Sequence, residues 1–177
     1  MKIIRFDELK AVPWKNGLGI TREIAVIPEG AGMDDFLWRV SIADVDTASP
    51  FSTFPGIDRT IVLLEGDGFT MTLDGEREHA LTVPCEPFSF AGEAKVEVRL
   101  AGGATRDFNL MVRRGKARGE VRALRGEADV SRATLVYLSS GHGTADGEPV
   151  VAGDTVFEAT SLQLSADATA LVVTLTL

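Results

Sequence analysis

The stretch Trp38-Arg39-Val40-Ser41-Ile42-Ala43-Asp44-Val45 alternates apolar with small or polar side chains. A period of two is the pattern of a β-strand, in which successive side chains point to opposite faces of a sheet. Arg39 and Ser41 then share one face, and Trp38 lies with the aliphatic residues on the other. The stretch therefore predicts a strand with one apolar face and one face that carries polar groups.

Similar β-rich segments run along the whole chain, separated by Gly, Pro and Asp about every ten residues. Helical periodicity is nearly absent, since only residues 7–12 and 127–133 could hold a turn or two of helix. The sequence therefore predicts an all-β fold. The predicted strands are 21–27, 38–45, 58–64, 69–73, 96–100, 108–112, 121–124, 134–138, 155–157 and 171–175.

An internal similarity suggests two β units of the same plan. Residues 83–88 lead through a Gly-rich turn into the predicted strand 96–100, and residues 151–157 lead likewise into 171–175. The apolar pattern lapses near residues 113–118. We therefore predict a first unit at residues 1–115, which carries the ligand pocket, and a second, smaller unit at residues 116–177, with exchange of strands between them.

Charge and composition exclude several classes of function. The 177 residues carry a formal net charge of -8, and an acidic protein repels phosphate backbones and anionic lipid. No apolar run approaches the ~20 residues that cross a bilayer. The single cysteine, Cys85, excludes an internal disulfide framework and suits a reducing compartment. We expect a cytoplasmic protein that binds neither nucleic acid nor membrane.

The chain has too few histidines to bind a metal ion in the way that is common in β-barrel proteins. A barrel metal site needs about three histidines and a carboxylate, and the chain has two histidines, His79 and His142, in different halves. The sequence 139–143 also lacks the strand-to-helix elbow that exposes a catalytic serine. We expect no metal, no cofactor and no identifiable catalytic residue.

Three arginines, Arg22, Arg39 and Arg59, stand inside otherwise strand-like segments. Alternation predicts that Arg22 shares a face with Ile24 and Val26, and that Arg59 shares one with Ile61 and Leu63. An arginine that points into a β core must be neutralised, because burying it alone costs several kcal/mol. The neutralising group is either an internal carboxylate, such as Glu23, Asp44, Asp58 or Glu65, or a bound anion. A guanidinium is well shaped for two-point recognition of a carboxylate.

Five blocks of the sequence together resemble the HutD/Ves family. They are WKNGLGITREI at 14–24, WRVSIADV at 38–45, FSTFPGIDR at 51–59, FAGE at 90–93 and DFNLMVRRG at 107–115. One departure is Leu18, which interrupts a run that is usually glycine in the family. The resemblance implies a jelly-roll bicupin, two tandem cupin-like β-barrels without the metal-binding histidines. Members are associated with histidine utilisation and with a proposed regulatory role; others are labelled stress-induced.

The resemblance and the arginines together predict a metal-independent small-carboxylate binding protein, a sensor or regulator in histidine utilisation. The expected ligand is urocanate or a formylated glutamate. Because Trp38 faces away from Arg39 and Ser41, one strand cannot place all three in the same cavity. The candidate ligand-binding residues are Asn16, Thr21, Arg22, Trp38, Arg39, Ser41, Arg59, Asn109 and Met111.

Two alternative functions remain at this point. One is a metal-free hydrolase or isomerase that uses Asp58, Glu23 or Glu65 as general base beside an arginine. The other is a stress-related interaction protein without catalysis, whose interior is filled by side chains. A homodimer is an expectation that rests only on how common homodimers are among soluble proteins.

Overall fold

The computed structural model describes residues 1–126, 130 and 132–177, and it confirms the all-β class. The one helical element in these ranges is a short 3₁₀ helix, η1 (Phe6–Glu8). It overlaps the start of the predicted helical turn at 7–12, whose last residues instead enter a strand. The other predicted turn, 127–133, falls mostly outside the described residues. None of the described helical segments has the length and apolar character needed to cross a bilayer.

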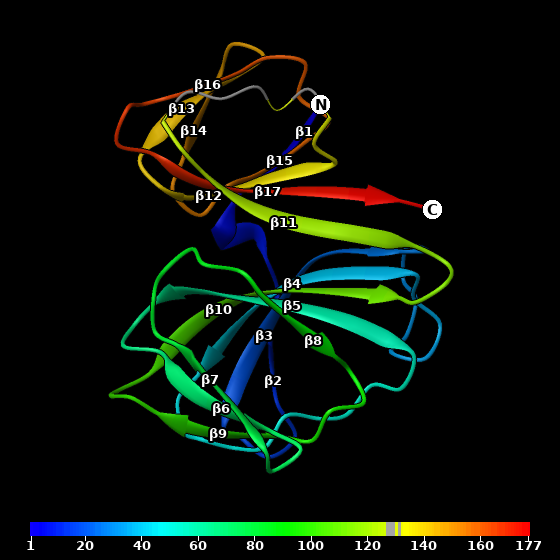
Figure 1. The fold of residues 1–177 in the computed structure, drawn as a ribbon. Coiled ribbons are helices and arrows are strands. Elements are labelled where there is room, and N and C mark those ends of the chain that lie inside the picture. The colour runs from blue at the N-terminus through cyan, green and yellow to red at the C-terminus, as the bar shows by residue number, and fades with distance from the viewer. Residues whose placement is uncertain (127–129, 131) are drawn as a thin grey trace. The chain divides into compact units, whose positions relative to one another are not determined.

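The chain divides into two compact units, which Figure 1 shows as ribbons. The first unit is Lys10–Arg118 together with Leu177, and the second is Met1–Leu9 with Gly119–Thr176. The first nine residues thus belong with the second unit, because strand β1 (Lys2–Ile4) pairs with β15 (Thr155–Phe157).

The first unit contains a six-stranded sheet in the order β2-β3-β4-β10-β5-β8 and a three-stranded sheet in the order β7-β6-β9. Both are open sheets in the described chain. The strands are β2 (Ala11–Pro13), β3 (Gly19–Ile27), β4 (Trp38–Val45), β5 (Ile57–Glu65), β6 (Phe69–Leu73), β7 (Arg77–Leu81), β8 (Phe88–Ala91), β9 (Val96–Leu100) and β10 (Thr105–Arg113).

The second unit has the same two-sheet plan, with a five-stranded sheet in the order β1-β15-β12-β17-β11 and a three-stranded sheet in the order β14-β13-β16. Its hairpin from His142 was missed by the sequence analysis, because its glycines and small polar residues carry little β-strand signal. The remaining strands are β11 (Arg118–Arg125), β12 (Leu135–Ser140), β13 (His142–Ala145), β14 (Glu148–Val151), β16 (Leu162–Leu164) and β17 (Thr169–Thr176).

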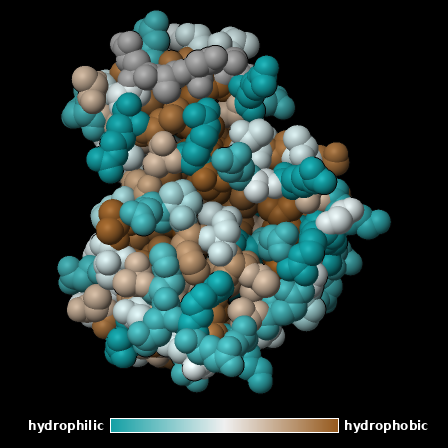
Figure 2. Space-filling model, viewed as in Figure 1, coloured by the Kyte–Doolittle hydropathy of each residue, from teal (hydrophilic) through white to brown (hydrophobic). Residues whose placement is uncertain are grey.

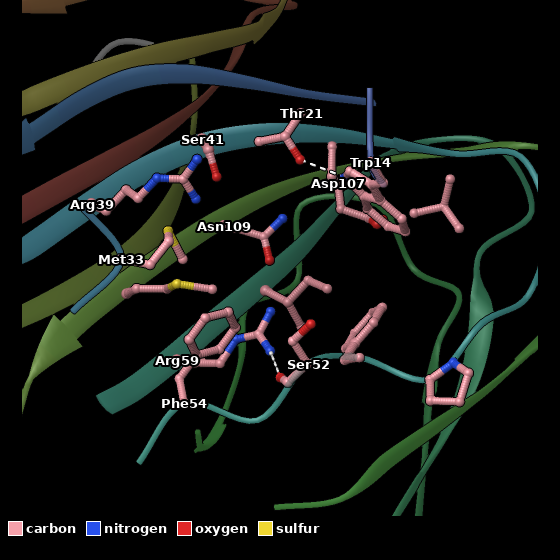
Figure 3. Close-up of a pocket in the computed structure, with 16 residues that line it drawn as sticks. Trp14, Thr21, Met33, Arg39, Ser41, Ser52, Phe54, Arg59, Asp107 and Asn109 are labelled. Carbon is pink, nitrogen blue, oxygen red and sulfur yellow. Dashed lines mark hydrogen bonds between the residues drawn. The ribbon is translucent and has the colours of Figure 1, made fainter. Parts of the chain in front are cut away.

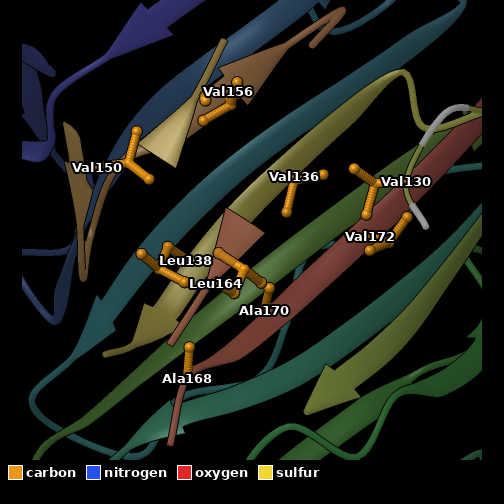
Figure 4. Packing of buried hydrophobic residues seen from close by; sticks show 10 residues of the cluster. Val130, Val136, Leu138, Val150, Val156, Leu164, Ala168, Ala170 and Val172 are labelled. Carbon is orange, nitrogen blue, oxygen red and sulfur yellow. The ribbon is translucent and has the colours of Figure 1, made fainter. Parts of the chain in front are cut away.

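Each unit buries its own apolar cluster between its two sheets. In the first unit Phe69 and Met71 of the small sheet pack with Ile61 and Leu63 of the large one, and all four are almost fully buried. In the second unit the cluster is aliphatic and includes Val136, Leu138 and Val172 (Figure 4). Charged and polar residues cover much of the outside, with single apolar residues among them (Figure 2).

Candidate functional site

The large sheet of the first unit carries a cavity of about 260 Å³ on one of its faces (Figure 3). This is slightly below the ~300–1,000 Å³ usual for drug-sized ligands, so the cavity suits a small metabolite. Its wall comes from four adjacent strands, β3, β4, β10 and β5, and from the loops before β3, β4 and β5. The lining residues are Trp14, Thr21, Met33, Arg39, Ser41, Ala43, Val45, Pro50, Phe51, Ser52, Phe54, Arg59, Ile61, Asp107, Asn109 and Met111.

The strand register arranges the wall in rows, because residues directly opposite each other in antiparallel strands point to the same face. Arg39, Met111 and Arg59 form one row across β4, β10 and β5. The next row places Ser41 and Ile61 on either side of Asn109. The row after that holds Thr21, Ala43 and Asp107. Rows are about 7 Å apart along a strand, so the cavity runs from two arginines to an aspartate.

Arg59 is a buried cation in this wall. Its side chain sits against the rings of Phe51, Phe54 and Phe90, with its guanidinium carbon 5.0–5.3 Å from each centroid. The residue is 7% exposed, and its Nε has no hydrogen-bond partner. Burial, and then the charge of Arg39, lower the pKa of Arg59 to about 10, so the group stays charged at neutral pH.

No carboxylate in the described part of the chain pairs with Arg59. Its recorded hydrogen bond is a long one of 3.5 Å, from Nη1 to the backbone carbonyl oxygen of Ser52. Aromatic faces stabilise a cation by about 0.5–2 kcal/mol each, less than a buried guanidinium loses in hydration. A buried arginine without a counter-charge, at the wall of a cavity, is the condition that a bound anion would relieve.

Arg39 supplies the second cation of the same row. Its Nε donates a hydrogen bond of 2.7 Å to Glu23 Oε2, and its side chain is 15% exposed. Figure 3 shows the guanidinium turned toward Ser41 on the same wall. The internal carboxylate of Glu23 therefore partly neutralises Arg39, which is one of the two alternatives that the sequence offered. Arg39 also lines the cavity.

Trp14 and Thr21 close the other end of the cavity. Trp14 Nε1 donates a hydrogen bond of 2.7 Å to Thr21 Oγ1. The ring lies so close to Gly19 that a Cβ there would be 2.9 Å from two ring atoms and 2.7 Å from the carbonyl oxygen of Asp44. Glycine at 19 is therefore required for the tryptophan to form this wall.

Asp107 is the most deeply buried polar group of the cavity. It is 1% exposed, and neither carboxyl oxygen has a hydrogen-bond partner. Burial, and then the negative charge of Asp44, raise the pKa of Asp107 to about 8. At neutral pH this carboxyl is therefore mostly protonated.

Six of the nine predicted ligand-binding residues line the cavity: Thr21, Arg39, Ser41, Arg59, Asn109 and Met111. The other three lie elsewhere. Trp38 is 7% exposed on the opposite face of β4, as the alternation predicted. Asn16 is exposed, and its Oδ1 accepts a hydrogen bond from the backbone N–H of Leu18. Leu18 itself does not line the cavity.

Arg22 is also on the opposite face, where its Nη1 lies 2.6 Å from Asp44 Oδ2. The prediction that Arg22 shares a face with Val26 is wrong, because a β-bulge between Glu23 and Ala25 shifts the register of β3 by one residue. Asp44 also accepts from Arg106 at 2.6 Å. Burial raises the pKa of Asp44, but the hydrogen bonds from Arg106 and Arg22 outweigh it and lower the pKa overall.

None of the three general bases considered from the sequence lines the cavity. Glu23 is the partner of Arg39. Asp58 pairs with Arg114 at the surface, and Glu65 is exposed beside Arg106. Asp58 points away because it alternates with Arg59 along β5. Glu65 points away because the register shift between Arg106 and Asp107 pairs it with Arg106, which lies on the face away from the cavity. Within the described ranges, no three His, Cys, Asp or Glu side chains converge as a metal site.

Ten of the sixteen lining residues were not predicted from the sequence, among them Trp14, Phe51, Phe54, Met33 and Asp107. For Asp107 a signal was present, because it lies two residues before Asn109 and four before Met111 on the same strand face. The loop residues carried no such signal, since no periodicity places a loop side chain against a sheet.

The two-sheet plan is that of a cupin-like protein. A cupin 2 conserved barrel domain protein from Leptotrichia buccalis superposes with a TM-score of 0.60, covering 99% of this chain and 96% of that one, at 12% identity. This likeness shows the fold.

The chain belongs to the HutD family, whose model matches residues 7–175. An uncharacterized 21.2 kDa protein in the hutC 3′ region of Pseudomonas putida is 37% identical over 145 residues, which span 80% of this chain and 75% of that protein. Protein Ves of Cronobacter sakazakii is 38% identical over 144 residues, 78% of this chain and 77% of that one. The structure of HutD from Pseudomonas fluorescens SBW25 matches with a TM-score of 0.82 and 30% identity, covering 99% of this chain and 98% of that one.

Proposed function

We propose that the protein binds a small carboxylate metabolite in the cavity of its first unit, without a metal, and acts as a sensor or regulator in histidine utilisation in the cytoplasm. The proposal takes each unit as a cupin-type barrel, of which the first holds the ligand. The link to histidine utilisation comes from the family and from the relative in the hutC region. The proposed ligands are urocanate and formylated glutamate.

Arg59 is the observation that carries the proposal. It holds a charge at neutral pH, it is 7% exposed, and no carboxylate among the described residues neutralises it. A ligand carboxylate would supply the missing counter-charge, and guanidinium groups bind carboxylates with two parallel hydrogen bonds. Arg39 in the same row adds a second cation, and Asn109 between the rows offers both a donor and an acceptor.

A thermal-shift screen tests the proposal with formate, urocanate, formylglutamate, formiminoglutamate and glutamate as probes. Formate is included because the Pseudomonas fluorescens HutD structure is described as a formate condition. A ligand at about 100 times its dissociation constant stabilises the fold by ~2.7 kcal/mol, or a midpoint shift of roughly 5–10 °C.

The matched variants are Arg59→Met and Arg99→Met. Arg99 is exposed on β9, so its replacement removes one positive charge without touching the cavity. We expect a selective shift that survives in Arg99→Met and disappears in Arg59→Met. A shift that persists in Arg59→Met, or no shift with any probe, would contradict the carboxylate site.

A further inference from the structure

Asp107 lies at the far end of the cavity from the arginines. Its row is two rows away from that of Arg39 and Arg59, about 14 Å along β10. Figure 3 shows it beside Trp14 and Thr21, with Asn109 between this end and Arg59. The cavity therefore has two chemically different ends.

The fold itself gives Asp107 no partner. Both carboxyl oxygens are buried without a hydrogen bond, and so is Thr105 Oγ1, two residues earlier on the same face of β10. Buried polar groups in native proteins are nearly always hydrogen-bonded, and leaving one unpaired is costly. A carboxyl retained in this state, on the wall of a cavity, points to a group that arrives from outside the chain.

The protonation of Asp107 limits what that group can be. With its pKa raised to about 8 by burial and by Asp44, the carboxyl at neutral pH offers one O–H donor beside one carbonyl acceptor. An amide offers the complementary pair, an N–H beside a carbonyl oxygen. A second carboxylate offers only acceptors and brings a negative charge to a buried end of the cavity, where the charge of Asp44 behind the sheet already disfavours one.

We propose that Asp107 recognises an amide-type group at one end of the ligand while Arg59 and Arg39 hold a carboxylate at its other end. The inference rests on the proposed function and deepens it, because it names the ligand class as a carboxylate joined by a short chain to an amide-type group. Asp107 is then the residue that selects this class against carboxylates that lack an amide-type group.

Three probes of equal chain length test the inference: glutarate, glutaramate and 5-aminopentanoate. Each carries a carboxylate at one end, and the opposite end is a second carboxylate in glutarate, an amide in glutaramate and an ammonium group in 5-aminopentanoate. Titration calorimetry at pH 7 measures their dissociation constants. We expect glutaramate to bind at least tenfold more tightly than the other two.

Two variants at the same position separate recognition from packing. Asp107→Asn keeps a donor beside an acceptor in nearly the same shape, so the preference for glutaramate should persist. Asp107→Leu removes both, so the affinity for glutaramate should fall at least tenfold, to that of glutarate. The thermal midpoint of each variant verifies that it is folded, and the Asn variant keeps the test valid where Leu does not fold.

The possible outcomes distinguish the proposed carboxylate site from the proposed role of Asp107. Equal affinity for the three probes, or a preference that survives Asp107→Leu, would overturn the role of Asp107 and leave the carboxylate site standing. A preference for 5-aminopentanoate that is lost in Asp107→Asn would overturn it in favour of an ionised aspartate that binds a cation. Failure of all three probes to bind would overturn the carboxylate site itself.

Discussion

Two buried aspartates, one in each unit, differ in what surrounds them. Asp154 of the second unit is 2% exposed, and it pairs with Arg5 and accepts a hydrogen bond of 2.8 Å from the backbone N–H of Val151. Asp107 of the first unit is 1% exposed and has no partner. The two buried aspartates therefore differ in their hydrogen bonding. The fold supplies partners for the carboxylate of Asp154, whereas the carboxyl of Asp107 is left without one and can bind a ligand.

The interiors of the two units also differ in the kind of side chain that they bury. The second unit buries a wholly aliphatic cluster in which Ala145 and Ala170 are fully covered. The first unit keeps a cavity whose wall includes Arg59 and Asp107, beside its own apolar cluster. Two regions of similar two-sheet plan thus differ in the polar groups that their interiors contain.

The largest expected effect is a gain of stability in Asp107→Asn at high pH. The pKa of Asp107 is about 8 in the folded chain and ~3.9 when unfolded, so between these values the folded state holds a proton that the unfolded state has released. Stability therefore falls as pH rises from about 4 to about 8, by up to ~5 kcal/mol. Asparagine does not titrate and avoids this loss.

Urea denaturation at pH 5, 6.5 and 8.5 measures the effect. The advantage of Asp107→Asn over the parent should grow across the series and level off above pH 8. A difference that stays constant with pH would mean that Asp107 titrates normally, and the contrast with Asp154 would then break down.

Asp154→Asn should give a smaller change of the opposite sign. The charge-assisted bonds to Arg5 and the Val151 N–H are weakened, and bonds to charged groups contribute about 1.5–3 kcal/mol. Arg5 is partly exposed, so we expect a loss of about 2 kcal/mol near neutral pH. Asp7→Asn, at an exposed position of η1, is the control and should change little. A stable Asp154→Asn variant would remove the distinction between the two aspartates.

A matched pair of alanine substitutions probes the two interiors directly. Ala170→Leu should cost about 1–3 kcal/mol, because Ala170 is 0% exposed in a packed cluster. Ala43 lines the cavity, so Ala43→Leu should cost less than ~1 kcal/mol and abolish the ligand-induced thermal shift. Equal costs at the two positions would show that the cavity does not accommodate added volume.

Arg59→Met should change the stability of the ligand-free protein only modestly, with a gain of about 1 kcal/mol. Removing a buried cation that lacks a counter-charge relieves its desolvation, but it also removes the contacts with three phenylalanine rings. The midpoint of urea denaturation measures the change. A loss of 3 kcal/mol or more would mean that Arg59 is paired, and its place as the unneutralised group of the first unit would be wrong.

Alternation along single strands predicted much of the site. It placed Arg39 and Ser41 on one face of β4 and Trp38 on the other, as the structure has them. Alternation failed at β3, where the bulge after Glu23 reverses the facing of later residues. A bulge leaves no clear mark in sequence, because it depends on pairing with the neighbouring strand.

The ion pairs were less predictable than the strands. The sequence offered Asp44 and Glu23 as partners for any of the three arginines, and register alone decides that Asp44 serves Arg22 while Glu23 serves Arg39. Burial was equally hidden, since Asp107 lies just before the predicted strand 108–112 and was not among the predicted ligand-binding residues. Its unpaired state depends on every neighbouring strand, which a single segment does not reveal.

Strand β1 has a consequence for the synthesis of the chain. Ile4 pairs with Thr155 and Lys2 with Phe157, so β1 leaves the ribosome about 150 residues before its partner exists. At ~5–20 residues per second this delay is roughly 8–30 s, ample for Lys10–Arg118 to fold first. A tag or deletion at the first nine residues should therefore spare ligand binding while impairing the part of the protein that is translated last.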